Sequence, residues 1–184
     1  TLVILTTDNG PETAGEVSPG AYDRIQKHQH ASMGELRGVK RDLWEGGHRV
    51  PFLARWPGKI PVGTVSDETI CHMDFMATVA ALLDVKLPPN AGEDSFNLLP
   101  VLHGQKPAHP VREAVVHHAG SGRFAIRRGD WVLIEKGTGD DNRGDASEPA
   151  WLKRNRGYEP DQSDGQLFNL RDDPAQKTNL YSAQ

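Results

Sequence analysis

Two oxygen-bearing side chains, Asp8 and Asn9, stand together near the start of the chain. They follow residues 1–7, whose β-branched and leucine side chains predict a buried strand, and Gly10 and Pro11 continue them as a turn. Carboxylate and amide oxygens are ligands that Ca²⁺ and Mg²⁺ prefer, and they suit Zn²⁺ poorly. The pair therefore indicates part of a hard-cation site, although the same residues could serve as an Asx turn that ends the strand.

A lysine in a stretch rich in charge and glycine is the second candidate. Lys40 lies within residues 36–60, between two predicted strands. A point cation beside a divalent metal can clamp a tetrahedral oxyanion such as sulfate or phosphate, and it can counter the charge that develops on that group. Lysine is also the common residue of solvated surfaces, so the type alone leaves both interpretations open.

The eight histidines and the single cysteine give weaker signals. No histidine has the helical HExxH spacing or a cysteine partner, so zinc is not favoured. His117 and His118 are adjacent on a predicted strand and must point to opposite faces, so that at most one of them can line a given pocket. Cys71 has no nucleophile signature and precedes a predicted helix, where we expect a small core residue.

The elements that must carry these side chains change in character along the chain. The best helical pattern follows the second apolar run, with Asp74 as the expected N-cap. Beyond residue 110 the pattern becomes one of short alternating strands, two of them joined by a hairpin turn at 128–130. We expect strands at 1–7, 50–56, 113–117, 123–127, 131–135 and 166–170, a helix at 74–84, one helical turn within 95–104, a loop at 11–35 and an exposed insertion at 137–165.

Composition excludes several classes of protein. The 184 residues carry a formal net charge of -4, so no general attraction to nucleic acid or anionic membrane is expected, and any anionic ligand must be held locally. No run of eighteen apolar residues is present and the mean hydropathy is -0.58, which argues against a transmembrane segment. No signal peptide opens the chain. Because its first residues are Thr-Leu-Val-Ile-Leu, we expect them to come from the interior of a larger protein.

The order of these segments resembles the C-terminal part of a type I sulfatase, the formylglycine-dependent arylsulfatase family of the alkaline phosphatase superfamily. Thr-Thr-Asp-Asn-Gly-Pro at 6–11 resembles the family's second metal motif. Leu-Arg-Gly-Val-Lys-Arg-Asp-Leu-Trp-Glu-Gly-Gly-His-Arg-Val-Pro at 36–51 resembles its lysine motif. The familiar order is completed by the segments at 56–60, 72–74, 98–104, 126–134 and 167–180.

The resemblance implies an α/β fold, in which residues 1–109 are the C-terminal part of an alkaline-phosphatase-like mixed-sheet catalytic domain and residues 110–184 are a small α+β domain with an antiparallel sheet. It implies hydrolysis of a sulfate ester to an alcohol and inorganic sulfate. By matching position, Asp8 and Asn9 would ligate Ca²⁺, or Mg²⁺ in its place. Lys40 would contact the sulfate as a catalytic residue, and His117 or His118 would reach the substrate.

The chain departs from the family in lacking a Cys-x-Pro-Ser-Arg or Ser-x-Pro-Ser-Arg segment, from which formylglycine is made. We therefore expect a fragment that is inactive alone and whose partners are the missing N-terminal half and a sulfated small molecule or glycan. Family resemblance suggests a periplasmic or secreted location. Two alternatives stay open: a phosphodiesterase or phosphonate hydrolase of the same superfamily, and a noncatalytic module that binds sulfated glycans. The DNA upstream of Thr1 would separate them, because a sulfatase must encode the nucleophile segment there.

Overall fold

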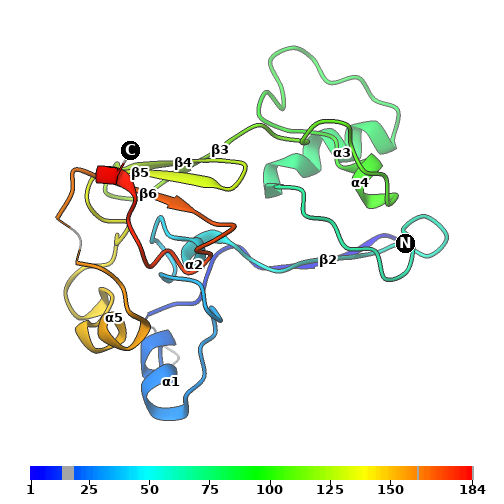
Figure 1. Ribbon diagram of the computed structural model, residues 1–184. Helices are drawn as coiled ribbons and strands as arrows, with labels where there is room; N and C mark the ends of the chain where they lie inside the picture. Colours follow the sequence, from blue (N-terminus) through cyan, green and yellow to red (C-terminus); the bar gives the residue numbers. More distant parts are fainter. Residues whose placement is uncertain (14–18, 161, 184) are drawn as a thin grey trace. The chain divides into compact units, whose positions relative to one another are not determined.

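The computed structural model describes residues 1–13, 19–160 and 162–183 (Figure 1). The chain divides into two compact units, each built from two separate stretches of sequence. Unit 1 comprises Thr1–Leu5 and Phe52–Glu113, and unit 2 comprises Thr6–Pro51 and Ala114–Gln184. Within the described residues, none of the helices has both the length and the apolarity needed to span a bilayer. The predicted boundary between residues 109 and 110 stays a prediction.

Unit 1 contains a two-stranded sheet and short helices. Strand β1 (Val3–Thr6) pairs with β2 (Phe52–Arg55), which confirms the first two predicted strands. The predicted helix is present as α3 (Phe75–Leu82), preceded by the 3₁₀ turn η1 (His72–Asp74). The single turn α4 (Leu99–Leu102) lies where one helical turn was expected.

Asp74 has a different task from the one predicted for it. Its side chain makes no N-cap bond to α3. Instead the fully buried carboxylate accepts from the backbone N–H of Cys71 at 2.7 Å and of Phe96 at 2.9 Å, and it pairs with the Arg112 guanidinium at 2.5 Å. A buried carboxylate needs such partners, so Asp74 ties three stretches of unit 1 together. Cys71 is half-buried, and burial raises the pKa of its thiol.

Unit 2 is built on a four-stranded antiparallel sheet in the order β3-β4-β5-β6. The strands are β3 (Val115–His118), β4 (Phe124–Arg128), β5 (Trp131–Glu135) and β6 (Gly165–Asn169). All four predicted strands are thus confirmed, as is the hairpin, in which Arg128 pairs with Trp131. Alternating side chains of β5 point to opposite faces, so Val132 and Ile134 are buried while Trp131 and Leu133 are exposed.

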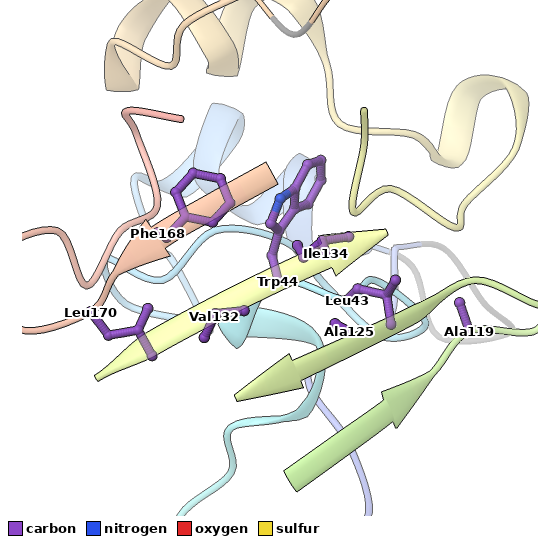
Figure 2. Close-up of a cluster of buried hydrophobic side chains, with 8 residues drawn as sticks. All are labelled: Leu43, Trp44, Ala119, Ala125, Val132, Ile134, Phe168 and Leu170. Atoms are coloured by element: carbon purple, nitrogen blue, oxygen red, sulfur yellow. The ribbon is translucent and has the colours of Figure 1, made fainter. Parts of the chain in front are cut away.

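The core on the buried face of this sheet includes two residues from the lysine motif at 36–51, which we also call the lysine-bearing segment. Figure 2 shows the cluster, whose members are Leu43, Trp44, Ala119, Ala125, Val132, Ile134, Phe168 and Leu170. The Trp44 indole is 1% exposed and donates from Nε1 to Gln166 Oε1 at 2.9 Å, which satisfies its one polar atom. The segment that carries Lys40 is therefore anchored in the core of unit 2.

Two stretches predicted as loops contain helices. Residues 11–35 include α1 (Ala21–His28), and residues 137–165 include η2 (Gly144–Ala146) and α5 (Ala150–Arg156). Residues 14–18 and 161 of these predictions lie outside the described residues. The second stretch is also not simply exposed, because Leu152 of α5 packs in a second cluster with Ala21, Tyr22, Met33 and Val39. Too few apolar residues mark these helices locally, and long-range packing stabilises them.

The same stretch bonds to the lysine-bearing segment through buried polar groups. Arg37 donates to Glu148 Oε2 from Nη2 at 3.0 Å and from Nε at 3.2 Å. Its guanidinium lies 3.9 Å from the centroid of the Trp44 ring and 4.4 Å from that of Tyr158. The prediction of an exposed insertion at 137–165 is therefore wrong for these contacts, since the charges that suggested exposure are paired in the interior.

Candidate functional site

The candidate metal segment, residues 6–11, lies beside the lysine-bearing segment in unit 2. Lys40 N–H donates to Pro11 O at 3.0 Å, and Gly10 N–H donates to Gly47 O at 2.9 Å. A Cβ atom on Gly10 would stand 1.9 Å from Gly46 O, so only glycine allows this approach. These contacts bring the two predicted motifs together, although they are about thirty residues apart in the sequence.

Asp8 and Asn9 present hard oxygen atoms. Asp8 is exposed. Asn9 donates from Nδ2 to Gly10 O at 2.8 Å, so Oδ1 is the atom left to accept a ligand, and this bond is not that of an Asx turn. No group of three or more His, Cys, Asp or Glu side chains within the described residues could hold a metal. The pair therefore fits Ca²⁺ by atom type and supplies part of the roughly six to eight oxygens that the ion takes.

The ammonium group of Lys40 faces an acidic residue that the sequence did not single out. Lys40 Nζ lies 3.4 Å from Glu12 Oε2, and the lysine side chain is 38% exposed. Arg41 donates to the same carboxylate from Nη1 at 2.8 Å and from Nη2 at 2.9 Å. These hydrogen bonds lower the pKa of Glu12 to about 2. Glu12 directly follows the segment at 6–11, so its position in the sequence was a usable signal.

A cavity of about 520 Å³ opens beside Asn9 in unit 2. Ser32, Met33 and Arg49 contribute to its lining, together with the backbone around Gly10 and Gly46. Lys40 is not among the described residues that line it. Asn9 and Arg49 therefore both belong to the lining of one concave surface.

The two histidines of β3 point to opposite faces, as the alternation of a strand requires. His118 is exposed and its ring centroid lies 4.7 Å from that of Phe124. His117 points toward helix α2 (Glu45–His48), where its ring centroid lies 3.8 Å from that of His48. Burial, and then the neighbouring His48, lower the pKa of His117 to about 3, so the imidazole is neutral at physiological pH.

Glu45 is the charged centre of this second group. Its side chain is 1% exposed and pairs with Arg127 Nη1 at 3.2 Å, with Arg49 Nη1 at 3.3 Å and with His48 Nε2 at 3.4 Å. Burial would raise the pKa of Glu45, but these three partners outweigh it and hold the pKa below its usual value. Glu45 thus joins the lysine-bearing segment to strand β4 through its ion pair with Arg127, which indicates a structural role.

The predicted site residues form two groups in the described structure. Lys40 and the metal segment are joined through the backbone, and His117 is joined to α2. No hydrogen bond or ion pair among the described residues links Lys40 to Asp8, to Asn9 or to either histidine. The functional roles of these residues stay predictions.

Comparison with known proteins agrees with these motifs. A family profile described as "Sulfatase" matches residues 1–85. The N-acetylgalactosamine-6-O-sulfatase of Bacteroides thetaiotaomicron is 32% identical over 183 residues, which are 98% of this chain and 32% of that protein. Mouse arylsulfatase G is 39% identical over 127 residues, which are 66% of this chain and 22% of that protein.

A solved structure gives the same answer for the fold. BT33336S-sulf, from work on glycosaminoglycan metabolism by Bacteroides thetaiotaomicron, superposes with a TM-score of 0.75 at 32% identity, covering 100% of this chain and 35% of that one. The fold is therefore the mixed α/β fold of the alkaline-phosphatase-like sulfatases. The chain belongs to the type I sulfatase family, and it spans about a third of the length of the relatives that match it over nearly all its residues.

Proposed function

We propose that this chain is the C-terminal third of a sulfuric ester hydrolase of the arylsulfatase type, which converts a sulfate ester to an alcohol and inorganic sulfate. The match to a sulfatase over 98% of the chain carries the proposal. The pairing of the metal segment with the lysine motif supports it, because it brings an oxygen-ligand segment and a cation-bearing segment together. The relatives are named as sulfatases, which does not favour a phosphodiesterase or a noncatalytic glycan-binding module.

In this proposal Asp8 and Asn9 supply oxygen ligands to a Ca²⁺ ion, with Mg²⁺ as the alternative. When bound, the cation polarises the oxygens of the sulfate group. Asn9 is prepared for this role because its Nδ2 is held by Gly10 O, which leaves Oδ1 as the ligand atom. The remaining ligands come from the preceding portion of the protein, since two side chains fill only part of the shell.

Lys40 binds the sulfate group and compensates the negative charge that develops on it. The ammonium is already held beside a carboxylate, Glu12, at 3.4 Å. A sulfate group that takes this position gains an attractive contact with Lys40 and Arg41 and a repulsive one with Glu12, so the three groups together limit how the anion can sit. His117 or His118 contacts the remainder of the substrate.

The nucleophile of the reaction is a formylglycine that the preceding portion supplies. Residues 1–184 contain no Cys-or-Ser-x-Pro-Ser-Arg segment, so the chain alone is expected to be inactive even with Ca²⁺ and a formylglycine-generating enzyme. Sequencing the DNA upstream of Thr1 tests this directly. Absence of that segment from the open reading frame would contradict the proposal, as would robust aryl sulfate hydrolysis by the purified 184-residue chain.

The substrate we propose is a sulfated small molecule or glycan. Relatives named for N-acetylgalactosamine-6-O-sulfate and for glycosaminoglycan metabolism support a glycan. A periplasmic or secreted location follows from the family and from such a substrate. A further partner in this proposal is the N-terminal portion of the same protein.

The metal assignment has its own test in the complete enzyme. Asp8→Ala is expected to abolish aryl sulfate hydrolysis and to weaken Ca²⁺ binding, because it removes a charged ligand. Asp23→Ala, which removes an exposed carboxylate from α1, is the matched control. Calcium titration and steady-state kinetics are measured on both variants. Unchanged Ca²⁺ affinity with normal turnover in Asp8→Ala would refute the assignment.

A further inference from the structure

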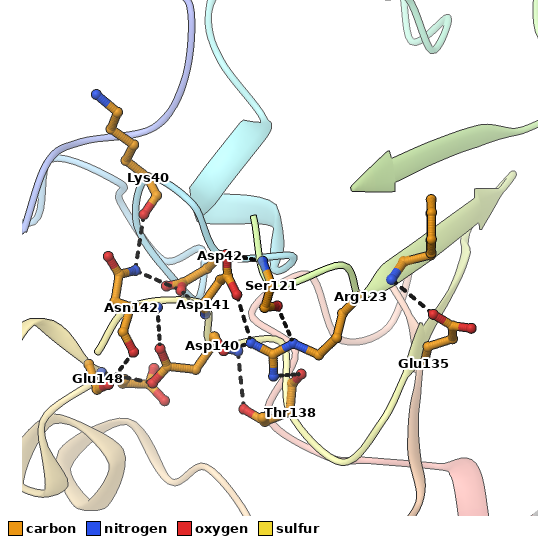
Figure 3. Close-up of polar contacts among 12 residues, drawn as sticks. Lys40, Asp42, Ser121, Arg123, Glu135, Thr138, Asp140, Asp141, Asn142 and Glu148 are labelled. Atoms are coloured by element: carbon orange, nitrogen blue, oxygen red, sulfur yellow. Dashed lines mark hydrogen bonds and ion pairs between the residues drawn. The ribbon is translucent and has the colours of Figure 1, made fainter. Parts of the chain in front are cut away.

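One buried amide bonds to three consecutive residues of the lysine motif. Asn142 is 8% exposed, and its Nδ2 donates to Lys40 O at 3.0 Å and to Asp42 Oδ1 at 2.8 Å (Figure 3). Its Oδ1 accepts from Arg41 Nη1 at 3.0 Å. The partners fix the orientation of the amide, because two acceptors face Nδ2 and a donor faces Oδ1. All of these residues belong to unit 2.

The backbone at this point has an uncommon conformation. Arg41 has φ = +83°, in the left-handed region that disfavours residues with a side chain. The peptide plane between Lys40 and Arg41 begins this turn, and Asn142 holds its carbonyl oxygen. The other side of the same turn is held too, since Lys40 N–H donates to Pro11 O at 3.0 Å. Both backbone polar groups of Lys40 therefore have a fixed partner.

Asp42 extends the same arrangement. Its carboxylate accepts from Val39 N–H at 2.9 Å, from Asp141 N–H at 2.9 Å and from the Asn142 amide. Asp42 and Asn142 therefore both bond to the backbone just before the left-handed residue Arg41, Asp42 to Val39 N–H and Asn142 to Lys40 O. Arg41, which makes the turn, sends its guanidinium to both Glu12 and Asn142.

We propose that Asn142 is a positioning residue for Lys40, which fixes the direction of the lysine side chain by holding the carbonyl and the left-handed turn that follow its Cα atom. The inference rests on the proposed sulfate-binding role of Lys40. Without the amide, the peptide between Lys40 and Arg41 can rotate toward an ordinary conformation, which moves the ammonium group away from its place beside Glu12. Small misplacements of a catalytic group cost large factors in rate.

A simple tethering role for Asn142 makes different predictions. Glu148, bonded to Arg37, already fixes the same stretch to the lysine-bearing segment. Asn179 provides a matched tether in the same unit, where its Nδ2 donates to Ser163 Oγ at 2.7 Å and to Gly165 O at 3.0 Å. Both asparagines make hydrogen bonds with both ends of the amide and hold at least one backbone carbonyl, and of the two only Asn142 bonds to the lysine motif.

The kinetic experiment is a double-mutant cycle in the complete enzyme with an aryl sulfate. Asn142→Ala and the isosteric Asn142→Asp, which loses the two donors, are expected to lower kcat by about 10-fold to 100-fold with less than about a 3-fold change in KM. Lys40→Ala keeps the carbonyl that Asn142 binds and removes only the ammonium group. In that background Asn142→Ala is expected to change kcat by less than about 3-fold.

Asn179→Ala serves as the control for general damage. It is expected to change kcat by less than about 3-fold in either background. The proposal is overturned if Asn142→Ala lowers kcat equally with and without Lys40, or if the Asn179→Ala variant matches it. Equal melting temperatures for the two alanine variants with unequal kcat would support positioning over stability.

Amide hydrogen exchange separates this inference from the proposed function. In the same complete protein, the N–H groups of Lys40 and Asp42 are expected to exchange at least about 10-fold faster in Asn142→Ala than in Asn179→Ala. If the wild-type protein hydrolyses no sulfate ester, the proposed function fails, and faster exchange at these two amides still supports the hold on the turn. Unchanged exchange at both overturns the inference, whatever the activity.

Discussion

Unit 2 contains two apolar clusters, whereas nearly all the apolar side chains of unit 1 are exposed or half-buried. In unit 2 the sheet, α1 and α5 each find a packing partner. In unit 1 only Ala80 and Leu98 are buried hydrophobic residues, while Leu5, Leu53 and Leu83 are 66%, 58% and 65% exposed. An apolar surface of this kind is usually covered by another part of a protein. The difference supports the proposal that another part of the protein packs on unit 1. Unit 2, in contrast, buries apolar side chains in its own two clusters.

The largest effect is expected in the core of unit 2. Trp44→Ala should lower the free energy of unfolding by about 3–5 kcal/mol, because it leaves a cavity and removes the hydrogen-bond donor to the buried Gln166 side chain. Trp131→Ala, at an exposed position of β5, should cost far less. Chemical denaturation monitored by fluorescence measures both. Equal costs would contradict the assignment of Trp44 to the core of unit 2.

The next effect concerns activity and not stability. Lys40→Ala in the complete enzyme should reduce kcat about 100-fold to 1000-fold, or about 2.7–4 kcal/mol, since a cation directed at developing charge favours the transition state. Lys27→Ala, an exposed lysine on α1, is the control. Steady-state kinetics with an aryl sulfate decide the matter. A change confined to KM would reduce Lys40 to a ground-state binding role.

The next expected effect is the contribution of His117, in unit 2, to the pH dependence of unfolding. The pKa of His117 is about 3 in the folded chain and 6.5 ordinarily, so between these values the unfolded chain binds more protons. The contribution of His117 to the free energy of unfolding should therefore be fully present above about pH 6.5 and be lost as the pH drops toward 3, by at most about 1.4 kcal/mol per pH unit. Asp42, whose pKa burial raises to about 7, contributes in the opposite direction, so the effect of His117 is read from the difference between two chains. The groups that face the imidazole are His48, Glu45 and Arg127.

His117→Phe keeps an aromatic ring and removes the titration, so its unfolding free energy should change less over this range. Urea denaturation at a series of pH values measures the two slopes. Identical slopes in the wild-type and variant chains would assign the pH dependence to other groups.

The smallest effect is expected on the exposed surface of unit 1. In the isolated chain, Leu83→Lys should change the free energy of unfolding by less than about 0.5 kcal/mol and reduce aggregation, because the leucine is already exposed. In the complete enzyme the same substitution should be clearly destabilising if that surface is covered. Thermal unfolding of both proteins compares the costs. A negligible cost in both would show that the surface stays exposed, which would remove this support for the comparison.

Strands and motifs were predictable from the sequence where the signal was local. The strands of the sheet of unit 2 are short runs rich in apolar, β-branched and aromatic residues, and the hairpin has a glycine at its turn, so each could be identified from a few neighbouring residues. The metal segment and the lysine motif were identifiable by their residue types. Their adjacency depends on the close approach of Gly10 to Gly46, which no local pattern states.

The helices α1 and α5 and the role of Asn142 were not predictable in this way. Residues 137–165 are rich in charge and glycine, which ordinarily indicates exposure. In the structure their charges and amides are partnered by the lysine-bearing segment, more than a hundred residues earlier, as with Asn142 and Lys40. Such pairing between distant segments is invisible to composition and periodicity, and it is where a candidate positioning residue arose.

The contact between Gly10 and Gly46 has a genetic consequence. Neither glycine carries a reacting group, yet a Cβ atom at position 10 would stand 1.9 Å from Gly46 O, and one at position 46 would stand 2.3 Å from Gly38 O within the lysine motif. In a saturation mutational scan scored for activity, both positions should therefore be as intolerant as Lys40, and a reader of that scan alone would mistake them for catalytic residues. Substitutions that change substrate preference are then expected at residues away from this contact.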